Sequence, residues 1–202
     1  FRRSTLEVMR QPLEDGTVTI SRAAGTFDFS SDCLLVAALN PCPCGFHGDS
    51  KRECRCSPRQ VEQYRQKISG PLLDRIDLHV EVPLIDFKQL SSKEKSESSA
   101  VVRDRVMSCR RRQQERFSAN ARTRTNSDMG PKLMREHCEI DASAAQLLEQ
   151  AMEQLNFSAR AHDRILKVAR TIADLAECEA ITADHLLEAI QYRSLDRKLS
   201  FS

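Results

Sequence analysis

Several features that would classify the chain at once are missing from its 202 residues. No stretch approaches the roughly 18 consecutive apolar residues that would span a bilayer, so no membrane partner is expected. The first ten residues, FRRSTLEVMR, contain no apolar signal-peptide core, and a cytoplasmic location is the expectation. Nothing matches the phosphate-binding pattern GxxxxGK(S/T). The chain begins at Phe1 rather than at methionine, which favours a fragment of a longer protein.

Net charge is small, and the position of the basic residues says more than their number. The formal net charge of +2 does not by itself indicate nucleic acid. Between Val101 and Thr125, however, eight arginines stand against two acids. These arginines are Arg103, Arg105, Arg110, Arg111, Arg112, Arg116, Arg122 and Arg124. A block this basic attracts phosphate backbones, and a solvated helix face is the open alternative.

The eight cysteines fall into two classes. Those that stand alone, and are expected to be ordinary thiols, are Cys33, Cys109, Cys138 and Cys178. The other four form two close pairs, namely Cys42 with Cys44 and Cys54 with Cys56. Four thiolates so arranged suit tetrahedral zinc, and a reducing cytoplasm argues against two disulfides. Because CxC is not the usual CxxC spacing, free loop thiols and a redox-active site stay open, and His47 is a spare ligand.

The first part of the chain is predicted to be α/β. An amphipathic helix is expected over Phe1 to Leu13. Two β-rich segments, Thr17 to Arg22 and Thr26 to Phe29, flank Ala23-Ala24-Gly25 and predict a hairpin. The unbroken apolar run from Cys33 to Leu39 is typical of a strand buried on both faces. The sheet edge beside this run is expected to be exposed or covered by a second copy.

Two polar residues occupy the ends of predicted strands. Asn40 follows the apolar run, where ligands gather in an open α/β sheet, and an Asx turn before Pro41 is the alternative. Arg75 precedes Ile76 to Val82, which alternates apolar and polar residues as a half-buried strand does. Since acids lie on both sides of Arg75 in the sequence, its side chain is expected to be fixed in position.

Helices are predicted to dominate the remainder. Ser57 and Pro58 have the chemistry of a helix start, and that helix is expected to reach Ile68. The serine-rich segment 91–99 is the predicted linker between domains 1–90 and 100–202. The helices expected beyond it are Ala100–Phe117, Ala142–Leu155, Ala159–Ala176 and one capped by Thr182. Together they predict a small helical bundle.

Arg160 lies in the first turn of the helix predicted over Ala159–Ala176. A cation there opposes the helix dipole, so an anion is expected nearby. The candidates are Asp163, Asp174 or a bound ligand. Arg170, on the same helix, is expected to pack or pair within the bundle.

Four stretches, in order along the chain, resemble the magnesium-chelatase-like AAA+ ATPases and, within them, the bacterial ComM and YifB group. They are RQPLEDG at 10–16, AALNPCPCG at 37–45, GPLLDRIDL at 70–78 and ARTIADL at 169–175. The resemblance implies an α/β plus α fold, in which a partial P-loop AAA+ core is followed by a helical-bundle lid. It also implies that the phosphate-binding loop and the Walker B acids precede Phe1. The chain alone is therefore expected to be inactive.

Within this family the resemblance also implies particular roles. Asn40 matches sensor 1, Arg75 matches the arginine finger, and Arg160 matches sensor 2 of the lid. The finger acts on ATP held by a neighbouring subunit, which implies a hexameric ring. Arg22, at the hairpin tip, is a candidate DNA contact. The basic block adds the further DNA candidates Arg110, Arg111 and Arg112.

The implied function is an ATPase motor that uses ATP and Mg²⁺ in the full-length protein to remodel DNA. Branch migration or helicase action in recombination or natural transformation is the expected setting. A magnesium-chelatase subunit acting on tetrapyrroles is one alternative. A zinc-stabilised module that binds nucleic acid or acts as an adaptor, without ATPase activity, is another.

Overall fold

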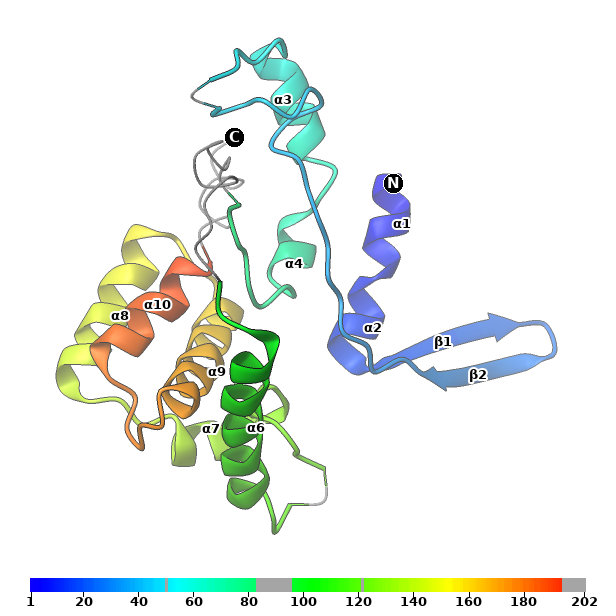
Figure 1. Ribbon diagram of the computed structural model, residues 1–202. Helices are drawn as coiled ribbons and strands as arrows, with labels where there is room; N and C mark the ends of the chain where they lie inside the picture. Colours follow the sequence, from blue (N-terminus) through cyan, green and yellow to red (C-terminus); the bar gives the residue numbers. More distant parts are fainter. Residues whose placement is uncertain (50, 83–95, 121, 194–202) are drawn as a thin grey trace. The chain divides into compact units, whose positions relative to one another are not determined.

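The computed structural model describes residues 1–49, 51–82, 96–120 and 122–193. The structure is mixed α/β, with predominant helices and a two-stranded antiparallel sheet (Figure 1). The chain forms two compact units, the first containing residues 1–76 and the second beginning at Asp77. The predicted linker at 91–99 lies largely outside the described residues. No helix in the described ranges is both long and apolar enough to cross a membrane.

The N-terminal segment forms two short helices, α1 (Arg3–Val8) and α2 (Arg10–Asp15), where the sequence predicted one. They meet at Met9. Pro12 explains the division, because proline has no N–H to donate to the carbonyl four residues earlier, at Val8. Helix α2 ends at Gly16, which adopts the left-handed conformation at φ 64° and donates its N–H to the carbonyl of Pro12 at 3.1 Å.

The predicted hairpin is confirmed as β1 (Thr17–Arg22) and β2 (Gly25–Ser30). The two strands are antiparallel, and the pairing of Arg22 with Gly25 leaves a two-residue connection. Two directly opposed apolar pairs, Val18 with Phe29 and Ile20 with Phe27, lie on the same face because side chains alternate along a strand. Phe27 and Phe29 are each 54% exposed, so this face is largely uncovered.

The strand predicted over Cys33–Leu39 is absent, and that prediction was wrong. This segment has no regular secondary structure, and its apolar side chains are exposed, Leu34 by 91% and Val36 by 84%. A strand buried on both faces requires hydrogen-bonded neighbours and covering layers. The sheet of the described residues contains β1 and β2 alone, so no neighbouring strand pairs with the run.

The strand predicted over Ile76–Val82 is also absent, and its side chains do not alternate between buried and exposed as predicted. Leu78, Val80 and Val82 are at least half exposed, whereas His79 is buried. The N–H of His79 donates to the carbonyl of Tyr192 at 2.7 Å, a bond that belongs to no sheet among the described residues. The alternating pattern therefore did not determine the structure, because the segment joins no sheet.

Between these two segments the chain forms α3 (Pro58–Arg65) and α4 (Gly70–Leu73). The start of α3 was predicted correctly: the Ser57 hydroxyl accepts from the N–H of Gln60 at 3.3 Å, and the Gln60 side chain accepts from the N–H of Ser57 at 2.9 Å. This reciprocal capping box fixes the helix start. Helix α3 ends at Arg65, earlier than predicted.

The second unit is a helical bundle around α9 (Figure 1). Its elements are α6 (Ser99–Arg116), the 3₁₀ turn η1 (Asn126–Asp128), α7 (Pro131–His137), α8 (Ala142–Gln154), α9 (Ala159–Leu175) and α10 (Ala183–Gln191). The predicted bounds of α6, α8 and α9 agree with these to within one residue at each end. Helix α9 begins as predicted, with the Ser158 hydroxyl accepting from the N–H of Ala161 at 3.2 Å.

The principal hydrophobic core belongs to this bundle. Its buried residues are Phe117, Met129, Met134, Cys138, Ala144, Leu148, Ile165, Leu166, Ala169, Ala173, Ile181, Leu186 and Ala189. Ala169 and Ala173 have no exposed surface, which allows α10 to pack closely against α9. A parallel bridge between Ile140 and Ile181 joins the segment before α8 to the segment before α10.

The isolated cysteines should differ strongly in reactivity. Burial raises the pKa of Cys138 to about 11 and also raises the pKa of Cys109, whereas Cys33 is exposed. Because the thiolate is the nucleophile, iodoacetamide at pH 8 should modify Cys33 at least tenfold faster than Cys109 or Cys138. Peptide mapping by mass spectrometry measures the three rates. Equal labelling of Cys33 and Cys138 would contradict the buried position of Cys138.

Candidate functional site

The four paired cysteines converge on one point in the first unit. All four sulfurs lie within 4.8 Å of one another. The Sγ–Sγ distances are 3.3 Å for Cys42–Cys44, 3.7 Å for Cys42–Cys54 and 3.6 Å for Cys44–Cys54. Cys56 completes the group, and the four residues together can hold a metal ion. We call these four residues the thiol cluster.

The loop that separates the two cysteine pairs is shaped by local interactions. Gly45 and Gly48 both have φ 84°, a left-handed conformation that glycine adopts without steric cost. The N–H of Gly45 donates to the carbonyl of Cys42 at 3.0 Å and closes the first turn. Farther along, the Asp49 carboxylate accepts from the backbone N–H of Arg52 at 3.2 Å. These turns bring the chain back, so Cys54 lies beside Cys42.

The members of the thiol cluster differ in acidity. A hydrogen bond with the Phe46 backbone lowers the pKa of Cys44 to about 6. Burial raises the pKa of Cys56 to about 12. The thiol cluster thus combines a thiol of lowered pKa with one of raised pKa. Thiols lose their protons when they bind a metal, so any metal affinity of the cluster will depend on pH.

Arg75 is buried rather than projecting from a strand. It follows α4, and its side chain is 6% exposed. The guanidinium forms an ion pair with Glu14 and donates to the carbonyl of Pro71 at 2.6 Å. The expectation of a fixed side chain agrees with these contacts. The described partner, Glu14, is distant in sequence and was not predicted.

Asn40 and Arg160 lie in different units and are both exposed. Asn40 is in the irregular segment that leads to Cys42. Arg160 is in the first turn of α9, as predicted. Of the residues predicted to form sites, those that the structure brings together are the four of the thiol cluster.

The arginines predicted to contact DNA are mostly at the surface. Arg22 is exposed at the end of β1, beside the hairpin turn. Arg110 and Arg111 are exposed on α6, while Arg112 is partly covered, with its Nη2 3.9 Å from Oε2 of Glu177. Arg116, from the same basic block, is directed into the bundle instead. The block is therefore only partly a solvated helix face.

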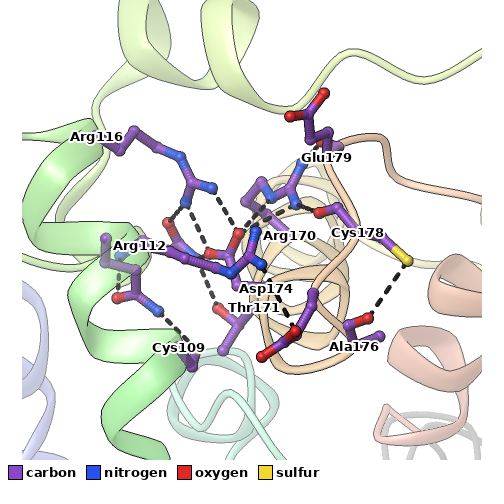
Figure 2. A network of polar contacts seen from close by, with 12 residues as sticks. Cys109, Arg112, Arg116, Arg170, Thr171, Asp174, Ala176, Cys178 and Glu179 are labelled. Carbon is purple, nitrogen blue, oxygen red and sulfur yellow. Dashed lines mark hydrogen bonds and ion pairs between the residues drawn. The ribbon is translucent and has the colours of Figure 1, made fainter.

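A polar network centred on Asp174 was not predicted (Figure 2). The two terminal guanidinium nitrogens of Arg116, Nη1 and Nη2, donate to the Asp174 carboxylate at 2.7 and 2.5 Å. Arg170 donates to Asp174 from Nε at 3.2 Å, and Asn126 donates from Nδ2 at 2.8 Å. Asp174 is 1% exposed and Arg170 is 3% exposed. Pairing of Arg170 within the bundle is confirmed, and Asp174 binds these partners as part of the bundle interior.

Comparison with known proteins assigns both halves of the chain. Residues 1–90 match the family model "Magnesium chelatase, subunit ChlI", and residues 96–193 match "Magnesium chelatase, subunit ChlI C-terminal". The chain belongs to the magnesium-chelatase-like family. Among relatives of this family, it is 40% identical to the competence protein ComM of Haemophilus influenzae and 40% identical to YifB of Escherichia coli. The matches to ComM and YifB cover 98% of this chain and 38% of each relative.

The magnesium-chelatase-like relatives extend beyond these two proteins. Rv2897c of Mycobacterium tuberculosis is 34% identical over 94% of this chain and 37% of its own length. The chain thus spans well under half of the length of the curated relatives it matches.

Proposed function

We propose that this chain is part of a cytoplasmic, ATP-driven AAA+ motor that remodels DNA during recombination or natural transformation. The observation that carries the proposal is the ordered match of both halves to one family, together with 40% identity to a competence protein. In this proposal residues 1–90 are the C-terminal part of the AAA+ core, 91–99 are the linker and 100–202 are the lid. Nucleotide binding then requires the full-length protein.

The proposed motor residues divide the chemistry of phosphoryl transfer. Asn40 orients the attacking water, and Arg160 reaches the phosphates from the lid. Arg75 stabilises the transition-state charge on ATP bound by the neighbouring subunit of a hexameric ring. An arginine suits this role because it is permanently charged and bidentate. To reach that phosphate, Arg75 must exchange Glu14 for the nucleotide of the neighbour.

The proposed cofactors and partners follow from the same assignment. In this proposal the full-length protein binds ATP and Mg²⁺, and the thiol cluster binds a structural Zn²⁺. DNA is the proposed substrate, bound through Arg22 at the hairpin and through Arg110 and Arg111 on α6, whose exposure supports the assignment. Such contacts neutralise phosphates and weaken as salt rises.

Magnesium chelation is the second candidate, since both matching family models carry that name. A chelatase subunit would use the same ATPase chemistry on a tetrapyrrole. The competence protein among the 40% identical relatives favours DNA as the substrate.

The test uses the full-length protein and measures ATP hydrolysis with and without branched DNA. We expect DNA to stimulate hydrolysis several-fold at low salt, and the paired Arg110→Ala and Arg111→Ala changes to reduce that stimulation. Arg135→Ala, an exposed arginine on α7, is the matched control and should leave it unchanged. Hydrolysis that DNA does not change but a porphyrin stimulates would contradict the motor and support the chelatase function. DNA binding without any hydrolysis would instead support a binding module.

A further inference from the structure

The sulfur–sulfur distances in the thiol cluster are close to those of a tetrahedral metal site. Four sulfurs each about 2.3 Å from a central zinc ion lie roughly 3.8 Å from one another. The distances observed among Cys42, Cys44 and Cys54 are 3.3 to 3.7 Å, and the Cys56 sulfur lies within 4.8 Å of all three. Modest outward movement of the sulfurs would admit one ion.

The same geometry argues against two disulfides. Disulfide sulfurs lie about 2.05 Å apart, so oxidation would separate the cluster into two bonded pairs. Instead, Cys42, Cys44 and Cys54 are mutually close to a similar degree, which indicates a common centre. All four cysteines are free thiols. The donor set is entirely sulfur, which selects a soft or borderline ion such as zinc over Mg²⁺.

The burial pattern shows why this part of the chain would need a metal. Cys42 has no exposed surface, although only Asn40 and Pro41 separate it from the exposed apolar segment 33–39. The apolar side chains buried in the described part of the first unit are few: Cys42, Val61, Leu72 and Leu73. So small a core contributes little stability, and structures of this kind are commonly held by metals or disulfides.

We propose that Cys42, Cys44, Cys54 and Cys56 bind one Zn²⁺ in a closed structural site that joins the end of the irregular segment to the start of α3. The first ligand lies two residues after Asn40, and the last lies immediately before Ser57, the N-cap of α3. The ion therefore fixes Asn40 relative to α3. The assignment of the metal site does not depend on the proposed motor. The functional importance of positioning Asn40, in contrast, rests on the proposed motor function.

The test begins with the metal content of the purified chain and of the full-length protein, measured by plasma mass spectrometry. We expect one zinc per chain. The double variant Cys54→Ser with Cys56→Ser should lose it, because two ligands cannot close the site. The matched control, Cys33→Ser with Cys178→Ser, removes two cysteines outside the cluster and should retain one zinc.

Two further readouts apply to the unmodified protein, so the result does not depend on whether a variant folds. Replacement of zinc by Co²⁺ should produce the intense visible and near-ultraviolet bands of a tetrahedral thiolate centre. Chelation should lower the thermal unfolding temperature of the first unit and expose four additional thiols to a colorimetric thiol reagent. A folded, metal-free chain that shows no cobalt bands would overturn the proposal, as would iron in place of zinc or cysteine pairs found oxidised. None of these readouts measures ATP hydrolysis, so their result tests the zinc site without testing the proposed motor.

Discussion

Replacing Arg75 by alanine in the full-length protein is expected to lower ATP hydrolysis on the order of a thousandfold or more, while ATP binding persists. In the proposed motor Arg75 is the arginine finger, and such a residue stabilises charge that develops in the transition state and contributes little to ground-state binding. Steady-state hydrolysis and the affinity for a fluorescent ATP analogue measure the two effects. Arg75→Lys, which keeps the charge but not the bidentate geometry, should recover only part of the rate.

The ion pair with Glu14 supplies the matched control. Arg75 is 6% exposed and paired with Glu14, so a purely structural role predicts that Arg75→Ala and Glu14→Gln do similar damage. The finger predicts a separation, since Glu14→Gln keeps the guanidinium and should retain most of the hydrolysis. Light scattering establishes whether each variant assembles to the same size as the unmodified protein. Unchanged hydrolysis in assembled Arg75→Ala would remove the finger assignment and leave Arg75 as an ion-pair residue.

Replacing Asp174 by alanine is expected to lower the free energy of unfolding of the helical bundle by about 3–5 kcal/mol. The substitution leaves the guanidinium groups of Arg116 and Arg170 beside each other without their carboxylate. Removing one member of a buried ion pair lowers stability because the remaining charge stays desolvated without a partner. Urea unfolding followed by circular dichroism measures the loss. Asp163→Ala, at an exposed carboxylate paired with His162, is the control and should cost less than about 1 kcal/mol.

The same network predicts how the stability of the bundle depends on pH. Burial acts to raise the pKa of Asp174, but hydrogen bonds from Arg116 and Asn126 and the charge of Arg170 outweigh it and hold the pKa below its ordinary value. The folded pKa is thus lower than the unfolded value of about 3.9. The contribution of Asp174 is present above that value and is lost as pH falls through the folded pKa. Asp174→Asn should reduce the fall in unfolding free energy at acidic pH. An unchanged dependence of that free energy on pH would contradict the assignment.

The sequence predicted those elements whose determinants are local. The hairpin follows from two β-rich segments and a short turn, and α3 from a capping box contained within residues 57–60. Helix α9 follows from its Ser158 cap and its broad apolar face. In each case the interactions that decide the structure lie within a few residues of one another.

The predictions that were wrong concern segments that depend on distant partners. The apolar run at 33–39 and the alternating run at 76–82 have the composition of strands, but a strand also needs a neighbour with which to pair. The Asp174 network was missed for a similar reason, since Arg116 is 58 residues away from Asp174. A usable signal was present, because Asp174 lies among the apolar residues of α9, four residues after Arg170. An acid in that position indicates a buried pair.

The hydrophobic core lies mainly in the second unit, so substitutions of apolar residues should affect stability differently in the two units. In the bundle, the apolar residues of the core are buried, so substitutions among them will register directly as lost stability. In segment 33–39 the side chains of Leu34 and Val36 are already largely in solvent, and shortening these two removes little packing. A stability screen of this chain would therefore report the run around Leu34 and Val36 as freely replaceable. Any requirement for those residues must come from what they meet during function, and only a selection for activity would detect it.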